Sequence, residues 1–362
     1  MSGAMPVELA PWTDRRALRV LGMGMAVPGE PVPTVELLER VERRFGVAVR
    51  RRGQALARRL GIETRHLCRD LDARHETPRS GHGNPDLAAA ALRAALAEAR
   101  LRVRDLAYLI GHTTTPACQV PPNIALVADR LGFTGPYMEL RQACTGFANA
   151  LVIAQGLVVA PGVNAIGIVG SETGSVYFDP LRAGENSAQL VNLVQMGDGA
   201  AAIIVARDDP SSGARLSHTF FGQAGLGRKA GLALSAGGSD TAAVGGGILE
   251  FEHDYAAVRA SGPELFDHGA AVARSLGAAV EAVDYIVPHQ ASGRMPELLG
   301  SRLGLESRRV FVNADRVGNT GSAAIWLALA ELRRRLEPGA RVLVLGAEAT
   351  KFMFGGFSYV HG

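Results

Sequence analysis

Two kinds of segment alternate along the chain, short apolar runs and longer amphipathic stretches. Short apolar runs bounded by turn residues predict buried strands, here at Leu18 to Met25, Leu106 to Ile110, a run ending at Val169, Ala202 to Ala206, Leu216 to Phe221, Tyr285 to Val287 and Val342 to Leu345. The longer stretches predict helices at Val35 to Phe45, Asn84 to about Arg100, Asn123 to Leu131, Leu151 to Ala160 and Pro263 to Leu276. Strands that alternate with helices predict an α/β fold, with a parallel sheet covered by helices on both faces.

This order of elements occurs twice. The first copy contains Cys144-Thr145-Gly146, an apolar helix, Pro161-Gly162, a strand and Gly170-Ser171-Glu172-Thr173. The second contains Asn319-Thr320-Gly321, an apolar helix, Pro338-Gly339, a strand and Gly346-Ala347-Glu348-Ala349-Thr350. Upstream, Tyr108-Leu109-Ile110-Gly111-His112 matches Tyr285-Ile286-Val287-Pro288-His289. Such self-similarity indicates two copies of one supersecondary unit.

We therefore predict an N-terminal half at residues 17–209 and a C-terminal half at residues 214–362. The polar stretch from Asp208 to Gly213 has the composition of a connection between them. Cys144 in one half then occupies the place of Asn319 in the other. Packing of the halves about a pseudo-two-fold axis would bring these two helix starts together and form a pocket there.

The composition is that of an ordinary globular protein, with 362 residues, 47% hydrophobic and 20% charged, and a net charge of +3. No apolar run reaches the ~18 residues of a membrane span, and Met1 to Thr13 lack the apolar core of a secretion signal. The cysteines Cys68, Cys118 and Cys144 have neither metal-site spacing nor an even number for disulfides. We expect a cytoplasmic protein without a metal site.

The charge is concentrated in an arginine-rich stretch, which comprises Arg43, Arg44, Arg50, Arg51, Arg52, Arg58, Arg59 and Arg65. A solvated helix face is the simpler interpretation, and a landing surface for phosphates or an acidic partner is the functional one. Nucleic acid is excluded because no reading motif or interleaved aromatic residues accompany the charge. A glycine-rich excursion from Gly222 to Gly247 lacks phosphate-loop spacing, and we interpret it as a loop near a pocket mouth.

Three polar residues lie at turns that follow strands of the predicted sheet. Cys144 precedes a helix, where free N–H groups and the helix dipole would favour the thiolate and lower its pKa, although a free cysteine is often a buried core residue. His289 follows a strand, where α/β sheets place their chemistry. Asn319 opens a helix, where a simple N-cap is the alternative. We interpret His112, His253 and His268 as structural.

Together these residues suit one reaction. Cys144 would take an acyl group as a thioester, and His289 and Asn319 would donate hydrogen bonds to the thioester oxygen of a second substrate. Loss of CO2 from that substrate leaves an enolate that the two donors stabilise. Its carbanion then attacks the acyl-cysteine. The tetrahedral oxyanion there needs backbone donors: the Cys144 N–H is one, and a glycine N–H of Gly355-Gly356-Phe357 could be the other.

The motifs Cys-x-Gly-Phe-x-x-Ala-Leu at Cys144, Pro-His-Gln-Ala at Pro288 and Gly-Asn-Thr-Gly-Ser-Ala at Gly318 resemble those of the thiolase-fold enzymes. The closest branch is the β-ketoacyl-acyl-carrier-protein synthase III type with its secondary-metabolism relatives. The resemblance implies a five-layered αβαβα fold, a cytoplasmic homodimer, and a transferase of fatty acid or polyketide biosynthesis. It also implies coenzyme A thioesters as substrates without a permanently bound cofactor, and an acyl carrier protein as partner.

The resemblance assigns further residues, with the Gly355 N–H as the second oxyanion donor. Arg65, Arg58 and Arg59 would bind a coenzyme A phosphate or the carrier, with Ser292 near the pantetheine in place of the usual asparagine. The acyl pocket would be lined by Val120, Phe147 and Phe357, with Val120 at the position where relatives that condense two long chains place a glutamate base. Two alternatives remain: an acyltransferase of this fold that moves the acyl group to oxygen or nitrogen without decarboxylation, and a non-catalytic acyl-binding subunit.

Overall fold

The computed structural model describes residues 9–72, 81–209, 213–234 and 252–362. The first part of the chain contributes five strands to the main path of the large sheet: β2 (Leu18–Ala26), β5 (Tyr108–His112), β6 (Tyr137–Leu140), β7 (Ile166–Glu172) and β8 (Gly199–Arg207). They lie in the order β2-β8-β7-β5-β6. β5 is parallel to β6 and β7, whereas β8 is antiparallel to β7 and β2.

The later strands repeat this arrangement. They are β9 (Arg215–Gln223), β12 (Tyr285–Pro288), β13 (Arg341–Glu348) and β14 (Met353–Val360), in the order β9-β14-β13-β12. β12 is parallel to β13, and β14 is antiparallel to β13 and β9. On the other side of β12, Ile286 forms a parallel bridge with Val310. The predicted parallel sheet is therefore wrong in detail, because each set of strands includes antiparallel pairs.

A narrow contact joins the two sets. β2 and β9 pair through Leu18 with Leu216 and Arg19 with Arg215, so the strands form one continuous path. The short β1 (Trp12–Asp14) pairs with the other end of β9. The proposed division into halves at residues 209 and 214 stays a prediction, and residues 210–212 of the connection lie outside the described residues.

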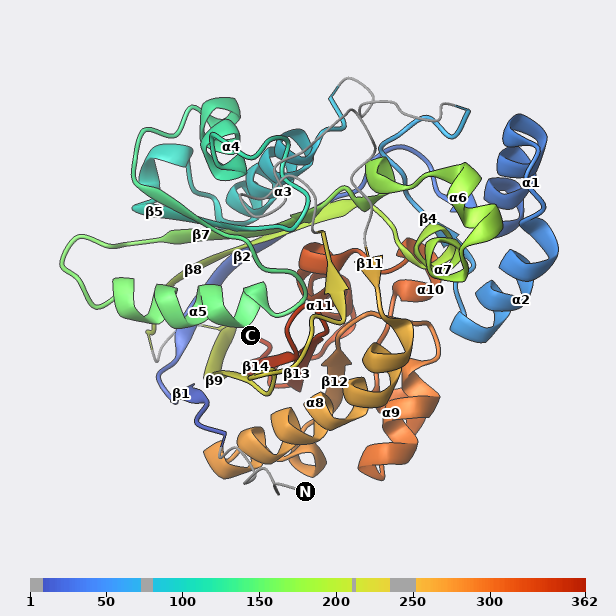
Figure 1. The fold of residues 1–362 in the computed structure, drawn as a ribbon. Helices are drawn as coiled ribbons and strands as arrows, with labels where there is room; N and C mark the ends of the chain where they lie inside the picture. The colour runs from blue at the N-terminus through green and yellow to red at the C-terminus, as the bar shows by residue number, and fades with distance from the viewer. Residues whose placement is uncertain (1–8, 73–80, 210–212, 235–251) are drawn as a thin grey trace.

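Helices form three further layers (Figure 1). The central layer holds α5 (Gly146–Leu157), which contacts β9 and β14 as well as β5 and β7, and α11 (Ala324–Leu332), which contacts β2, β8 and β12. One outer layer holds α3 (Asn84–Ala99) and α4 (Asn123–Leu131), and the other holds α8 (Tyr255–Leu276) and α9 (Met295–Leu303). α11 is apolar around nearly its whole circumference, as a helix buried between two sheets must be.

A further group of elements lies beside the layers, on the right of Figure 1. It comprises α1 (Thr34–Phe45), α2 (Arg50–Leu60), α6 (Pro180–Glu185), α7 (Ser187–Gln195), α10 (Ala314–Val317), the paired strands β3 (Val32–Pro33) and β4 (Thr64–Arg65), and the paired strands β10 (Leu232–Ala233) and β11 (Glu252–His253). The excursion from Gly222 begins inside β9, and its residues 235–247 lie outside the described residues.

One predicted helix start is confirmed and one needs correction. α3 begins at Asn84 as predicted and is capped at Gly83, whose N–H donates to Asp86, while the buried Asn84 side-chain amide donates to Thr113 and to Thr115. α8 begins at Tyr255, with Asp254 as the cap, so that Pro263 lies inside the helix. Within the described residues, no helix has the length and apolar character that crossing a membrane requires.

Candidate active site

Cys144 lies between the end of β6 and the start of α5. Its neighbours Ala143 and Thr145 are buried, while Cys144 itself is partly exposed. The buried carboxylate of Glu348, at the end of β13, accepts hydrogen bonds from the Thr145 N–H at 2.8 Å and the Thr145 hydroxyl at 2.6 Å. It also accepts the Ala143 N–H at 3.3 Å. The turn is therefore held from both sides of the cysteine.

The expected low pKa of Cys144 is wrong for this environment. Burial raises the pKa of the Cys144 thiol well above its ordinary value, and the charges of Glu348 and Glu172 raise it further. A hydrogen bond from its own backbone N–H acts in the opposite direction. The helix-start N–H groups on either side of the sulfur bind Glu348 instead of stabilising a thiolate.

Asn319 is anchored by its backbone and keeps a donor free. Its N–H donates to the Gln195 carbonyl at 2.8 Å, and its own carbonyl accepts the Gly197 N–H at 3.1 Å. Its side-chain oxygen accepts the Gly321 N–H at 3.1 Å. Among the described residues no hydrogen bond uses the side-chain NH2, so this group is available to a substrate oxygen.

His289 follows β12 and is 7% exposed. Its backbone N–H donates to the Leu345 carbonyl at 2.8 Å. Burial lowers the pKa of the imidazole to about 4, so His289 is neutral at pH 7 and carries one N–H. The ring atom Nδ1 has no hydrogen-bond partner among the described residues. A neutral imidazole can donate to an oxygen without bringing a charge.

Hydrogen bonds connect the three segments. The Gln195 side chain donates to the Ala291 carbonyl at 2.6 Å, in the His289 loop, while the Gln195 carbonyl accepts the Asn319 N–H. The Ser322 hydroxyl donates to the Gln142 carbonyl at 3.2 Å, two residues before Cys144. The start of the α11 segment therefore contacts the cysteine loop directly and the histidine loop through Gln195 of α7.

Arg65 was predicted to bind coenzyme A or the carrier, and this assignment is wrong. The side chain is fully buried, and its guanidinium donates to the Thr34 hydroxyl at 2.8 Å and to the Val194 carbonyl. Burial lowers the pKa of Arg65 to about 10, which still leaves it charged at pH 7. Its bonds tie α7 to the paired strands β3 and β4 and to the start of α1, and no face of the fully buried guanidinium is open to a ligand phosphate.

We expect Arg65→Ala to lower the free energy of unfolding by roughly 3 kcal/mol, because buried acceptors lose a charged donor. Urea unfolding measures this, with the exposed Arg58→Ala as a control that changes stability by at most about 0.5 kcal/mol. An Arg65→Ala protein of normal stability with a raised KM for an acyl-CoA would restore the ligand-binding assignment.

Other predicted contacts also change. The Ser292 hydroxyl is buried and donates to the Leu60 carbonyl at 2.6 Å, which commits it to the protein rather than to pantetheine. Gly355 lies inside β14, paired with Gly346 on one side and Phe221 on the other, and its role as an oxyanion donor stays a prediction. A Cβ there would lie 2.6 Å from that of Ala148 in α5.

The residues predicted for the acyl pocket separate into two groups. Phe147 and Phe357 are buried and pack at 5.7 Å between ring centroids, and each contacts Trp326. They pack in the core between the sheets, and their role as walls of an acyl pocket stays a prediction. Val120 is 84% exposed beside the Val120–Pro121 peptide bond, so it contributes to the outer surface of the subunit.

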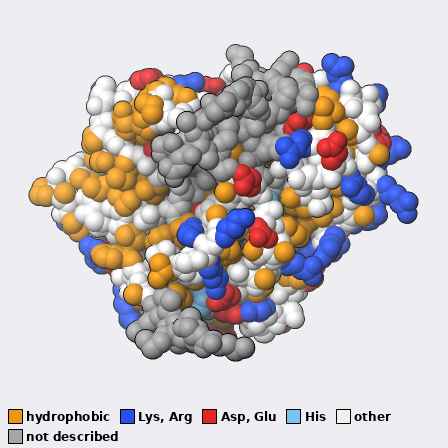
Figure 2. All heavy atoms as spheres, viewed as in Figure 1, with side chains coloured by type: hydrophobic (Ala, Val, Ile, Leu, Met, Phe, Trp, Pro, Cys, Tyr) orange, Lys and Arg blue, Asp and Glu red, His pale blue; other side chains and the backbone are white. Residues whose placement is uncertain are grey.

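The arginine-rich stretch other than Arg65 does lie on the surface. Figure 2 shows Lys and Arg side chains along the side of the molecule that carries α1 and α2. Its exposed members are Arg43, Arg44, Arg50, Arg51, Arg52, Arg58 and Arg59. Some are paired within the protein, as Arg50 is with Glu42 at 3.4 Å.

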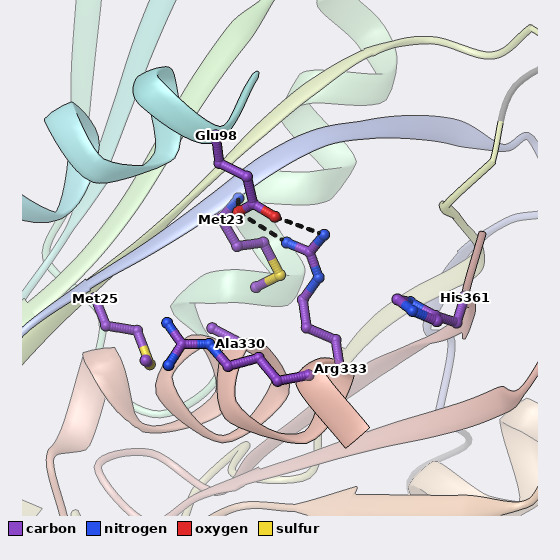
Figure 3. Close-up of a pocket in the computed structure, with 7 residues that line it drawn as sticks. Met23, Met25, Glu98, Ala330, Arg333 and His361 are labelled. Carbon is purple, nitrogen blue, oxygen red and sulfur yellow. Dashed lines mark hydrogen bonds and ion pairs between the residues drawn. The ribbon is translucent and has the colours of Figure 1, made fainter. Parts of the chain in front are cut away.

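A surface cavity lies away from this site (Figure 3). It is lined by Met23, Met25, Glu98, Ala330, Arg333, Arg334 and His361. Glu98 and Arg333 form an ion pair at 2.9 Å across it. The cavity lies at the far end of α11 from Asn319, includes no cysteine, and contains none of the predicted site residues. Among the described residues, no cluster of His, Cys, Asp and Glu could hold a metal ion.

The sequence analysis assigned no role to Glu172, Glu348, Gln195 or Ser322. The repeat itself contains a signal for the first two, because each ends a strand at the same position of its half. Gln195 and Ser322 gave no such signal, since their contacts join segments far apart in the chain.

The layered fold and the Cys144, His289 and Asn319 segments at its centre define a thiolase-like condensing enzyme. Residues 138–225 match 3-oxoacyl-[acyl-carrier-protein (ACP)] synthase III, and residues 273–354 match the C-terminal part of the same family. A β-ketoacyl-[acyl-carrier-protein] synthase III of Nitratidesulfovibrio vulgaris strain DP4 is 35% identical over 301 residues, 79% of this chain and 84% of the relative. The chain therefore belongs to the β-ketoacyl-[acyl-carrier-protein] synthase III family.

Solved structures agree with this assignment. AbyA1, a tetronic acid condensing enzyme, is 29% identical with a TM-score of 0.81, over 95% of this chain and 99% of AbyA1. The 3-oxoacyl-(acyl carrier protein) synthase III FabH of Pseudomonas aeruginosa PAO1 is 26% identical with a TM-score of 0.76, over 96% of this chain and 98% of that one. The protein is a β-ketoacyl synthase III-like acyltransferase of the condensing type.

Proposed function

We propose that Cys144 is the acylated nucleophile and that His289 and Asn319 promote decarboxylation of a malonyl-type thioester. The Cys144 sulfur attacks the carbonyl carbon of an acyl-CoA or acyl carrier, forming the acyl-cysteine. The C–S bond to the donor breaks, and the proton lost by Cys144 leaves with the donor thiol. The partly exposed position of Cys144 at a helix start supports this role.

In the second half-reaction, the carboxylate of the malonyl-type thioester leaves as CO2 and its electron pair forms an enolate. The enolate oxygen accepts hydrogen bonds from the neutral His289 imidazole and from the Asn319 NH2. The enolate carbon attacks the acyl-cysteine carbonyl, with the Cys144 N–H as one oxyanion donor. Collapse of this intermediate releases the β-ketoacyl thioester, and the sulfur regains a proton.

The observations that carry this proposal are the uncommitted NH2 donor of Asn319 and the neutral imidazole of His289. Asn319 uses its side-chain oxygen for Gly321, which leaves its NH2 without a partner among the described residues, and burial keeps His289 uncharged at neutral pH. An acyltransferase that skips decarboxylation needs neither feature. A general base would need His289 to accept a proton readily near pH 7, and the pKa of about 4 disfavours that.

We further propose a homodimer and a carrier-protein partner. β6 is the last strand of the sheet, and its outer edge has no neighbour within the described chain. Tyr137 on β6 is 42% exposed and Val120 is 84% exposed, so this edge offers apolar surface to a second copy. The exposed Arg58 and Arg59 of α2 are the candidate contacts for an acidic carrier or a coenzyme A phosphate.

The test is a two-step assay on the purified protein. Incubation with an acyl-CoA should increase the intact mass by one acyl group, and added malonyl-CoA or malonyl carrier protein should release CO2 and a β-keto product. A stable adduct that never condenses would indicate acyl transfer without decarboxylation. No adduct with a range of acyl donors would indicate the non-catalytic binding role.

A further inference from the structure

Glu348 occupies the position where a helix start normally binds an anion. Unpaired N–H groups and the helix dipole attract negative charge there. At the start of α5 that charge is a side chain of the protein, because the Glu348 oxygens accept the Ala143 and Thr145 N–H groups at 3.3 and 2.8 Å. The hydroxyls of Thr145 and Thr350 donate to the same carboxylate. The two backbone donors flank Cys144 in the sequence.

Glu172 binds the backbone in the same way at the turn that leads into α11. Its carboxylate accepts the Ser322 N–H at 3.0 Å and the Ser322 hydroxyl at 2.8 Å, next to Asn319. Thr114 and Thr115 donate to its second oxygen at 2.9 and 2.5 Å. Gly321 leaves room for this contact, since a Cβ there would lie 2.5 Å from a Glu172 oxygen. Glu172 ends β7 and Glu348 ends β13, so each carboxylate caps the opposite helix start.

All partners of these two buried carboxylates in the described chain are N–H or O–H groups, and none is a cation. Donors of this kind favour the charged form of a carboxylate, and at Glu172 they oppose the burial that raises the pKa of its carboxyl. The negative charge of such a carboxylate shifts the pKa of titratable groups near the segment that it binds, because the low-dielectric interior screens the charge poorly. At the α5 start the Cys144 thiol is a titratable group whose pKa this charge raises.

The other titratable groups around the α5 start can be assigned a charge. Those that face Cys144 and its segment are Glu348 from β13, Glu172 from β7 and His112 from β5; Arg141 of the same loop is exposed and pairs with Glu139. Burial lowers the pKa of His112 to about 3, so it is neutral at pH 7. The negative charge near the sulfur therefore comes from the two glutamates, with Glu348 the larger contributor to the raised pKa of Cys144.

We propose that Glu348 is a positioning residue that fixes the turn around Cys144 and keeps the resting nucleophile in its thiol form, and that Glu172 is its counterpart for Asn319. The inference rests on the proposed roles of Cys144 and Asn319. Each strand then holds the segment from the other half of the chain. Glu348 of β13 holds the Cys144 segment, which is acylated, and Glu172 of β7 holds the Asn319 segment, which promotes decarboxylation.

The experiment is the pH dependence of iodoacetamide alkylation, followed separately on the Cys144 and Cys118 peptides by mass spectrometry. Cys118 is exposed and serves as an internal reference in each sample. In the wild type the alkylation midpoint of Cys144 should lie above that of Cys118. A wild-type Cys144 midpoint below that of Cys118 overturns the proposal, whatever the variants do.

Glu348→Gln should move the Cys144 midpoint to lower pH and raise its alkylation rate at pH 7.5 about tenfold, the effect of one pKa unit. Glu348→Asp keeps the charge and should keep a wild-type midpoint, even if the shorter side chain loosens the turn. An equal shift in both variants, or none in Glu348→Gln, contradicts the proposal, because then the charge is not the cause.

Glu172→Gln is the matched control, since it removes an equivalent buried carboxylate from the other helix start. It should shift the Cys144 midpoint less than Glu348→Gln does, and slow malonyl decarboxylation more. The reverse order contradicts the assignment of each glutamate to the segment from the other half. Alkylation needs no condensation, so a protein that never condenses but shows these midpoints would disprove the proposed function and leave the role of Glu348 intact.

Discussion

Cys144→Ala abolishes the mass increase that the wild-type protein shows with an acyl-CoA. The methyl group of alanine cannot form a thioester, and the cysteine is the one nucleophile of the proposed site that attacks carbon. The substitution removes a partly exposed side chain and leaves the Glu348 contacts to Ala143 and Thr145 in place, because they involve backbone groups and the Thr145 side chain. The variant should therefore fold as the wild type does.

Intact-mass spectrometry after incubation with the same acyl donor measures this loss. The matched control is Cys118→Ala, which removes an exposed thiol outside the site and should load normally. Cys68 is a poor competitor, because it is buried and burial raises the pKa of its thiol. An acyl group retained on the Cys144→Ala protein would show that another residue is the nucleophile.

The sequence predicted β2, β5, β7, β8, β9, β12 and β13 of the large sheet and the helices α1, α3, α4, α5 and α8. The roles of Cys144, His289 and Asn319 stay a prediction. The bounds predicted for α4 are those observed, and α1 differs by one residue at its start. Both segments have strong helical periodicity and end at a glycine with positive φ. The repeat identified Cys144 and Asn319 as equivalent turns, because it depends on the order of elements and not on contacts.

Long-range contacts account for what the sequence missed. The pKa of Cys144 was predicted from its own helix, but Glu348, far along the chain, binds the helix N–H groups. Arg65 belongs to a run of arginines whose other members are exposed, and nothing local marks it as the one that β4 turns inward. The strand that contains Gly355 was also missed, and it lies between two others.

Local chemistry also misled the prediction of α8. Proline at the first position of a helix is common, and Pro263 was interpreted in that way. The side chain of Asp254 instead accepts the Ala257 N–H at 3.0 Å and starts the helix earlier. Pro263 therefore lies inside α8, eight residues after its first residue, Tyr255.

Asn319→Ala should load the acyl group as the wild type does and decarboxylate the malonyl-type thioester about 10²-fold more slowly, the scale for loss of one oxyanion donor. The backbone contacts of residue 319 to Gln195 and Gly197 do not involve the side chain, so the loop keeps its place. What is lost is the NH2 donor and the acceptor for the Gly321 N–H. Release of CO2 from acylated enzyme measures the rate.

Asn149→Ala is the matched control. This asparagine of α5 also has a side-chain NH2, but that group donates to the Gln142 side chain at 3.1 Å and is not available to a substrate. It should decarboxylate within a few-fold of the wild type. Equal loss of loading and decarboxylation in Asn319→Ala would contradict the division of roles, since it would mean that residue 319 supports the cysteine turn. The Ser322 hydroxyl, which contacts the Gln142 carbonyl, is the physical route for such coupling. Normal loading with slow decarboxylation therefore shows that this contact transmits no disturbance and that the amide acts on the enolate itself.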